Sequence, residues 1–98
     1  MIESSQSLAF TRRFRLGGIL QRITIDIWLD YATGAYSVSA SHAIQTPQQV
    51  GPNLPPPAQF AVSAEAAAEN VMHWYDVLWM RAVEAGFAPS DDWLVDGQ

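Results

Sequence analysis

Three consecutive segments of the chain alternate apolar and polar residues, and two glycine-containing turns separate them. The alternation covers residues 8–16, 19–31 and 35–44, and a two-residue period is typical of strands with one buried face. The apolar residues fall on even, then odd, then even positions, so antiparallel neighbours can bury one common face. The sequence therefore predicts a three-stranded antiparallel meander.

The first turn contains two adjacent glycines, Gly17 and Gly18. Two glycines can supply the positive φ angles of a type I′ turn, which is the usual two-residue connection of a β-hairpin. Such a turn would place Arg12 opposite Ile23 on the buried face. A slip of one residue would turn the isoleucines toward solvent, so the turn and the hydrophobic pattern support the same pairing.

The second turn, residues 31–34, ends in a glycine. We expect a four-residue loop built on a type I turn, with that glycine in the left-handed conformation. This loop would pair Ile27 with Val38 and, further along the strands, Ile23 with His42. The two hairpins together predict one row across the sheet in which an arginine and a histidine flank Ile23.

A proline-rich crossover, residues 46–61, follows the third strand. Its five prolines exclude a central strand or a helix interior, although residues 60–62 leave room for a short fourth strand at the sheet edge. A helix is predicted over residues 64–85, with Ser63 as its N-cap and Gly86 as its stop. Its apolar stripe would cover the isoleucine face of the sheet.

The fold class predicted for these 98 residues is α+β, in a single domain. One long helix packs on one face of the meander. The acidic and aromatic tail, residues 88–98, is expected to dock against the sheet or the helix through Trp93 and Leu94. The opposite face of the sheet would then have no cover from the chain itself.

Composition narrows the classes of protein to which the chain can belong. The net charge of −5 disfavours general attraction to nucleic acid, which needs a basic surface. No apolar stretch approaches the roughly 20 residues of a membrane span, and the start lacks the pattern of a secretory signal. We expect a cytoplasmic protein without cofactor, metal or membrane contact.

Catalytic chemistry finds little support in the sequence. The chain has no cysteine and no nucleophile motif, so a non-enzymatic role is predicted. Glu69, His73 and Asp76 would share one helix face, and a metal or acid–base role for them competes with a solvated acidic surface. The solvated surface is favoured, because a zinc site needs at least three ligands.

The outward face of the sheet is the first candidate site. Arg13, Arg15, Arg22 and Trp28 are expected to project from it. Arginines that flank an exposed tryptophan can contact a protein partner or a second copy of the chain, and this interpretation is preferred. They can also stack single-stranded nucleic acid, although sheet platforms of that kind use two or three aromatic residues.

A small pocket between sheet and helix is the second candidate site. The predicted row brings Arg12 and His42 to the inward face about 10 Å apart, with Gln21 nearby. A buried arginine needs an acid, a carbonyl or solvent, so these residues could hold a small anionic ligand. The alternative is that the arginine reaches solvent past the helix and that the histidine bonds to backbone.

Overall fold

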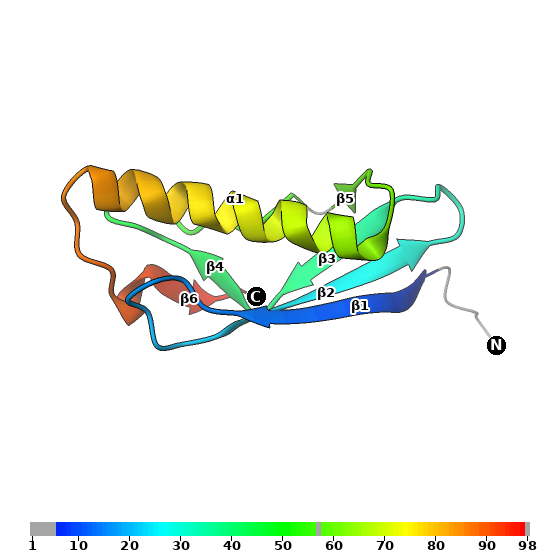
Figure 1. Cartoon of the computed structure of the whole chain (residues 1–98), viewed down its shortest axis with the longest axis horizontal. Helices are drawn as coiled ribbons and strands as arrows, with labels where there is room; N and C mark the ends of the chain where they lie inside the picture. Colours follow the sequence, from blue (N-terminus) through cyan, green and yellow to red (C-terminus); the bar gives the residue numbers. More distant parts are fainter. Residues whose placement is uncertain (1–5, 57, 98) are drawn as a thin grey trace.

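One long helix lies across one face of a β-layer, as Figure 1 shows. The computed structural model describes residues 6–56 and 58–97. The main sheet has the order β1-β2-β3-β5, and a second, smaller sheet pairs β4 with β6. The elements are β1 Gln6–Phe14, β2 Ile23–Asp30, β3 Tyr36–Ala40, β4 His42–Ile44, β5 Ala58–Gln59, α1 Ala64–Glu84, the 3-10 turn η1 Asp91–Trp93 and β6 Leu94–Asp96. The predicted α+β fold with a meander and one long helix is confirmed.

The second turn forms as predicted. The Asp30 amide donates to the Ala35 carbonyl oxygen at 2.9 Å, and the Gly34 amide donates to the Asp30 carbonyl oxygen at 2.9 Å. Gly34 has a φ of 73°, the left-handed conformation that this loop requires. Ile27 lies opposite Val38, so the predicted register between β2 and β3 is confirmed along this stretch.

The predicted register of the first hairpin is wrong by two residues. Arg12 lies opposite Ile25 rather than Ile23, and Phe14 takes the place opposite Ile23. Of the two glycines only Gly18 has a positive φ, 76°, so the turn is not type I′. A positive φ at the second central residue alone is typical of a type II turn, which splays the flanking strands, and the ladder begins only beyond residues 15–22. The shift is even, so the buried face is unchanged.

Close packing explains the two glycines. A Cβ atom on Gly17 would lie 3.0 Å from the Trp79 ring, and one on Gly18 would lie 2.9 Å from the Pro89 Cβ atom. The Trp79 indole N–H also donates to the Gly17 carbonyl oxygen at 2.9 Å. The loop therefore needs glycine because the helix and the tail press against its backbone.

A β-bulge interrupts β1 at Ala9. Phe10 lies opposite Ile27, but Leu8 lies opposite Trp28, so the pairing shifts by one residue between them. A bulge of one residue reverses the faces of the strand beyond it. Leu8 was expected on the buried face, and instead it projects to the open side with 53% of its surface exposed.

The predicted third strand, residues 35–44, is divided at Ser41. β3 ends at Ala40, and His42 pairs with Asp96 of the tail. The ladder between β2 and β3 ends at Ile25 opposite Ala40, so the predicted pair of Ile23 with His42 is not part of it. The tail supplies backbone partners that the meander cannot, including the Gly97 amide, which donates to the Ser41 carbonyl oxygen at 3.1 Å.

The helix limits follow from its caps. The Ser63 hydroxyl oxygen accepts from the Ala66 amide at 3.1 Å. At the other end Gly86 has a φ of 97°, and the Phe87 amide donates to the Ala82 carbonyl oxygen at 3.1 Å, the pattern of a Schellman motif. The predicted helix over 64–85 is confirmed to within one residue. The short fourth strand also forms, at Ala58–Gln59 rather than at 60–62.

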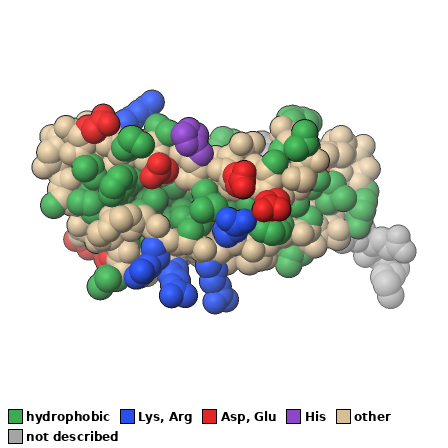
Figure 2. All heavy atoms as spheres, viewed as in Figure 1, with side chains coloured by type: hydrophobic (Ala, Val, Ile, Leu, Met, Phe, Trp, Pro, Cys, Tyr) green, Lys and Arg blue, Asp and Glu red, His purple; other side chains and the backbone are tan. Residues whose placement is uncertain are grey.

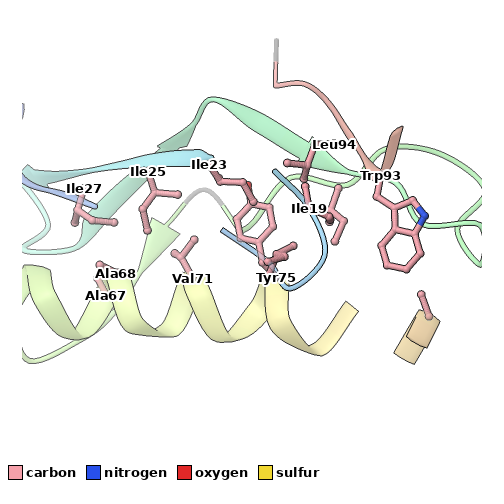
Figure 3. Packing of buried hydrophobic residues seen from close by; sticks show 13 residues of the cluster. Ile19, Ile23, Ile25, Ile27, Ala67, Ala68, Val71, Tyr75, Trp93 and Leu94 are labelled. Carbon is pink, nitrogen blue, oxygen red and sulfur yellow. The ribbon is translucent and has the colours of Figure 1, made fainter. Parts of the chain in front are cut away.

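The core lies between the helix and both sheets (Figure 3). Isoleucines of β2 point toward small residues of α1, and the docked tail closes the far end. Tyr75 crosses the core, where its hydroxyl donates to the His42 carbonyl oxygen at 2.6 Å. Trp93 and Leu94 are buried, so the predicted docking of the tail is confirmed. The fully buried large side chains are Tyr75, Ile23, Ile25, Ile27, Ile44 and Val71.

Candidate functional site

The face of the main sheet that points away from α1 is covered by no described element (Figure 1). Side chains from β1, β2 and β3 project from it, and we call them the open face. Its members are Leu8, Thr11, Arg13, Thr24, Asp26, Trp28, Ser37 and Ser39.

Cross-strand hydrogen bonds hold the open face in one arrangement. The Thr11 hydroxyl donates to the Asp26 carboxylate at 2.8 Å. The Trp28 indole N–H donates to the Ser39 hydroxyl oxygen at 3.2 Å, so the polar edge of the ring has a partner on the neighbouring strand. Side chains that are ordered before binding lose less conformational entropy when a partner docks.

Leu8 is the open-face residue that sequence reasoning missed. The bulge at Ala9 places it directly across from Trp28, and the two side chains make an apolar pair on an otherwise polar surface. Alternation alone gives no signal of this change, because Leu8 and Phe10 are both apolar and two residues apart. The apolar area of the open face is therefore larger than the sequence indicates.

The four predicted interaction residues divide into two groups. Arg13 and Trp28 project from strands onto the open face, opposite Thr24 and Leu8 respectively. Arg15 and Arg22 are exposed on the loop between β1 and β2, not on the strands.

Figure 2 shows arginine side chains that project from the lower edge of the molecule, away from the helix. A guanidinium nitrogen of Arg12 lies 4.0 Å from a Glu65 carboxylate oxygen. Within residues 6–56 and 58–97, no carboxylate lies that close to the guanidinium of Arg13, Arg15 or Arg22. Their positive charge is therefore available to a partner.

The three predicted pocket residues are not brought together. Arg12 lies between β1 and α1, with one guanidinium nitrogen 3.7 Å from the Met72 sulfur and another 4.0 Å from a Glu65 carboxylate oxygen. His42 belongs to the second sheet, and Gln21 is exposed on the first loop. The row that suggested an anion pocket does not form, because β3 ends before His42.

The acidic face of α1 carries no metal-binding arrangement. Glu69 and His73 are exposed and Asp76 is half-buried. No group of three or more histidine, cysteine, aspartate or glutamate side chains could hold a metal ion within the described residues. In the same part of the chain, no helix has the length and apolar character needed to cross a membrane.

Burial in the core changes the proton affinity of Tyr75. Burial raises the pKa of its hydroxyl well above the usual value of 10.0, because the anion would lose its hydration inside the core. The neutral hydroxyl donates its proton to the His42 carbonyl oxygen. This contact joins α1 to the second sheet, so its role is structural.

Comparisons with known proteins give no further guide. No family model matches the chain, and neither the curated proteins nor the solved structures yield a match.

Proposed function

We propose that this chain is a non-enzymatic protein-interaction module that associates with a second copy of itself through the open face. The observation that carries the proposal is the cross-strand pair of exposed Leu8 and half-buried Trp28 on an ordered polar surface that no described element covers. Protein interfaces commonly place a tryptophan near their centre and polar groups around it.

The dimensions of the sheet support a weak dimer. The eight residues of β2 extend for about 26 Å, and the three strands that form the open face are about 14 Å wide. The open face therefore offers about 370 Å² per copy, or about 740 Å² in total, which is below the range for stable specific interfaces and fits a weak, transient contact. Association should accordingly depend on concentration.

The charges of the open face are self-complementary. Arg13 and Asp26 both project from it, on adjacent strands. In a two-fold arrangement of stacked sheets, Arg13 of one copy can lie against Asp26 of the other, and the same contact occurs twice. Such pairs set the orientation of the partners more than they add affinity.

Sedimentation velocity between about 10 μM and about 1 mM protein tests the proposal. We expect a monomer–dimer equilibrium that Trp28→Ser weakens by at least about tenfold, because the variant removes the central aromatic anchor. Met80→Ser is the matched control, since Met80 is 42% exposed on the helix and lies away from the open face. Circular dichroism should show both variants folded.

Two results would overturn the proposal: a monomer throughout this concentration range, or the same dimer constant for the Trp28→Ser protein. A third result would replace self-association with another function. If monomeric protein binds a random single-stranded oligonucleotide at low salt, and Trp28→Ser abolishes this binding, the open face is a nucleic-acid platform instead.

A further inference from the structure

Backbone hydrogen bonds at the two ends of the β2–β3 pair show which residues of β2 direct their N–H and C=O groups toward β3. The Asp30 amide bonds to the Ala35 carbonyl oxygen at 2.9 Å, and the Ser41 amide bonds to the Thr24 carbonyl oxygen at 2.9 Å. Even-numbered residues of β2 therefore direct their backbone groups toward β3. Because these directions alternate along a strand, odd-numbered residues of β2 direct theirs toward β1.

The same alternation determines which backbone groups of β1 remain open. Phe10, Arg12 and Phe14 lie opposite odd-numbered residues of β2 and bond to them. Thr11 and Arg13 lie between these positions, so their N–H and C=O groups point to the outer side of β1. β1 is the last strand of the main sheet, and no described strand lies beyond it. A second strand could pair there.

A hollow lies beside this edge, between β1 and the middle of α1. Its volume is about 260 Å³, which is below the roughly 300 Å³ at which pockets begin to hold drug-sized ligands, so it suits a side chain better than a whole small molecule. Figure 2 views the molecule from this side, with exposed apolar atoms between acidic groups and arginines. The hollow is lined by Phe14, Arg15, Leu16, Met72, His73 and Asp76.

The charge of Arg13 and the alternation of side chains along a strand indicate which residue types an added strand would need at the outer edge of β1. Arg13 projects to the open side of the sheet, so a residue paired with it on an added strand would project there too, about 5 Å away. An acidic side chain suits that position. The next residue of the added strand would point inward, toward Phe14 and Met72, where an apolar side chain suits the hollow.

We infer that the outer edge of β1 binds an extended peptide segment of alternating acidic and apolar residues, by strand addition. The backbone groups of Thr11 and Arg13 hold the peptide main chain, and the hollow beneath α1 accepts one apolar side chain. Peptide recognition at sheet edges combines main-chain hydrogen bonds with side-chain pockets in this way. The site is an edge rather than the open face, so the inference does not depend on self-association.

The test uses a fluorescein-labelled, end-blocked peptide, Glu-Val-Glu-Leu-Glu-Val-Glu, and fluorescence anisotropy with the whole chain. We expect saturable binding that Thr11→Pro weakens by at least about tenfold, because proline lacks the outward N–H. The β1–β2 ladder should survive, since proline is tolerated at edge positions whose N–H faces outward. Thr11→Val is the matched control: it also loses the hydroxyl but keeps the N–H, and it should bind like the unmodified protein.

A second measurement needs no folded variant. Two peptides methylated on alternate sets of backbone nitrogens should differ, because only one set can face β1. A lysine-for-glutamate peptide should bind at least about tenfold more weakly than the acidic one. Equal binding of both methylated peptides, equal binding of the lysine peptide, or no saturable binding below about 1 mM would each overturn the inference.

Discussion

Replacing Tyr75 with phenylalanine removes one hydroxyl from the centre of the core and leaves the ring in place. The Tyr75 side chain is fully buried, and its hydroxyl is 2.6 Å from the His42 carbonyl oxygen. The variant leaves that carbonyl without its partner inside the core. A buried polar group that loses its hydrogen bond costs about 1–3 kcal/mol, a large part of the roughly 5–15 kcal/mol of a typical domain.

Urea unfolding followed by circular dichroism measures this cost as a change in the free energy of unfolding. A loss of 1 kcal/mol corresponds to a fall in Tm of about 4–8 °C for a domain of this size. Tyr31→Phe is the matched control, because Tyr31 is 64% exposed and its hydroxyl lies 2.7 Å from the Ser7 hydroxyl at the surface. We expect that variant to change stability by less than about 0.5 kcal/mol. Equal effects of the two variants would refute the reasoning.

The unmodified protein and the Tyr75→Phe variant should also differ in stability at alkaline pH. Burial raises the pKa of Tyr75 above its usual value of 10.0. Below pH 10 the hydroxyl is protonated in both states, and its contribution to stability is complete. Above pH 10 the unfolded chain ionises while the folded chain holds its proton, so this group lowers the free energy of unfolding by up to about 1.4 kcal/mol per pH unit. Tyr75→Phe should show a shallower decline, and identical slopes would contradict the assignment.

Three further variants test the contacts that hold the loop and the tail. Gly18→Ala and Gly34→Ala both force alanine into a positive φ, but only the first meets an obstacle, the Pro89 Cβ atom at 2.9 Å. Gly18→Ala should therefore be the more destabilising by about 1–3 kcal/mol in urea unfolding, and equal costs would exclude the clash. Trp93→Ala should cost about 3–5 kcal/mol and speed hydrogen exchange of the Gln45 amide, which donates to the Trp93 carbonyl oxygen at 2.7 Å; unchanged exchange would argue against a docked tail.

Features that depend on neighbouring residues were predictable. The loop at 31–34 closes through hydrogen bonds between residues four and five positions apart, and Gly34 supplies the φ that the loop requires. The helix begins at a serine that caps it and ends where Gly86 reverses the chain. In each case the residue that determines the conformation is part of the element itself.

The candidate site was predictable only in part. Alternation along the strands correctly assigns Arg13 and Trp28 to the side away from the helix, because the side-chain period of a strand does not depend on its partner. It does not reveal that Leu8 joins them, since the bulge at Ala9 changes the pairing without changing the apolar pattern. The sequence also does not show that the backbone N–H and C=O groups of Thr11 point outward, because that direction depends on how β1 pairs with β2.

The amino-acid pattern alone determined the meander, the buried face of its strands beyond the bulge at Ala9 and the limits of the helix, because periodicity and capping act over a few residues. Tertiary contacts decided the rest. Gly17 and Gly18 accommodate Trp79 and Pro89, which are distant in the sequence, and the register of the first hairpin differs by two residues from the one that two glycines alone predict. The third strand divides because the tail offers a second pairing partner about fifty residues away, and long-range pairing of this kind leaves no local signal.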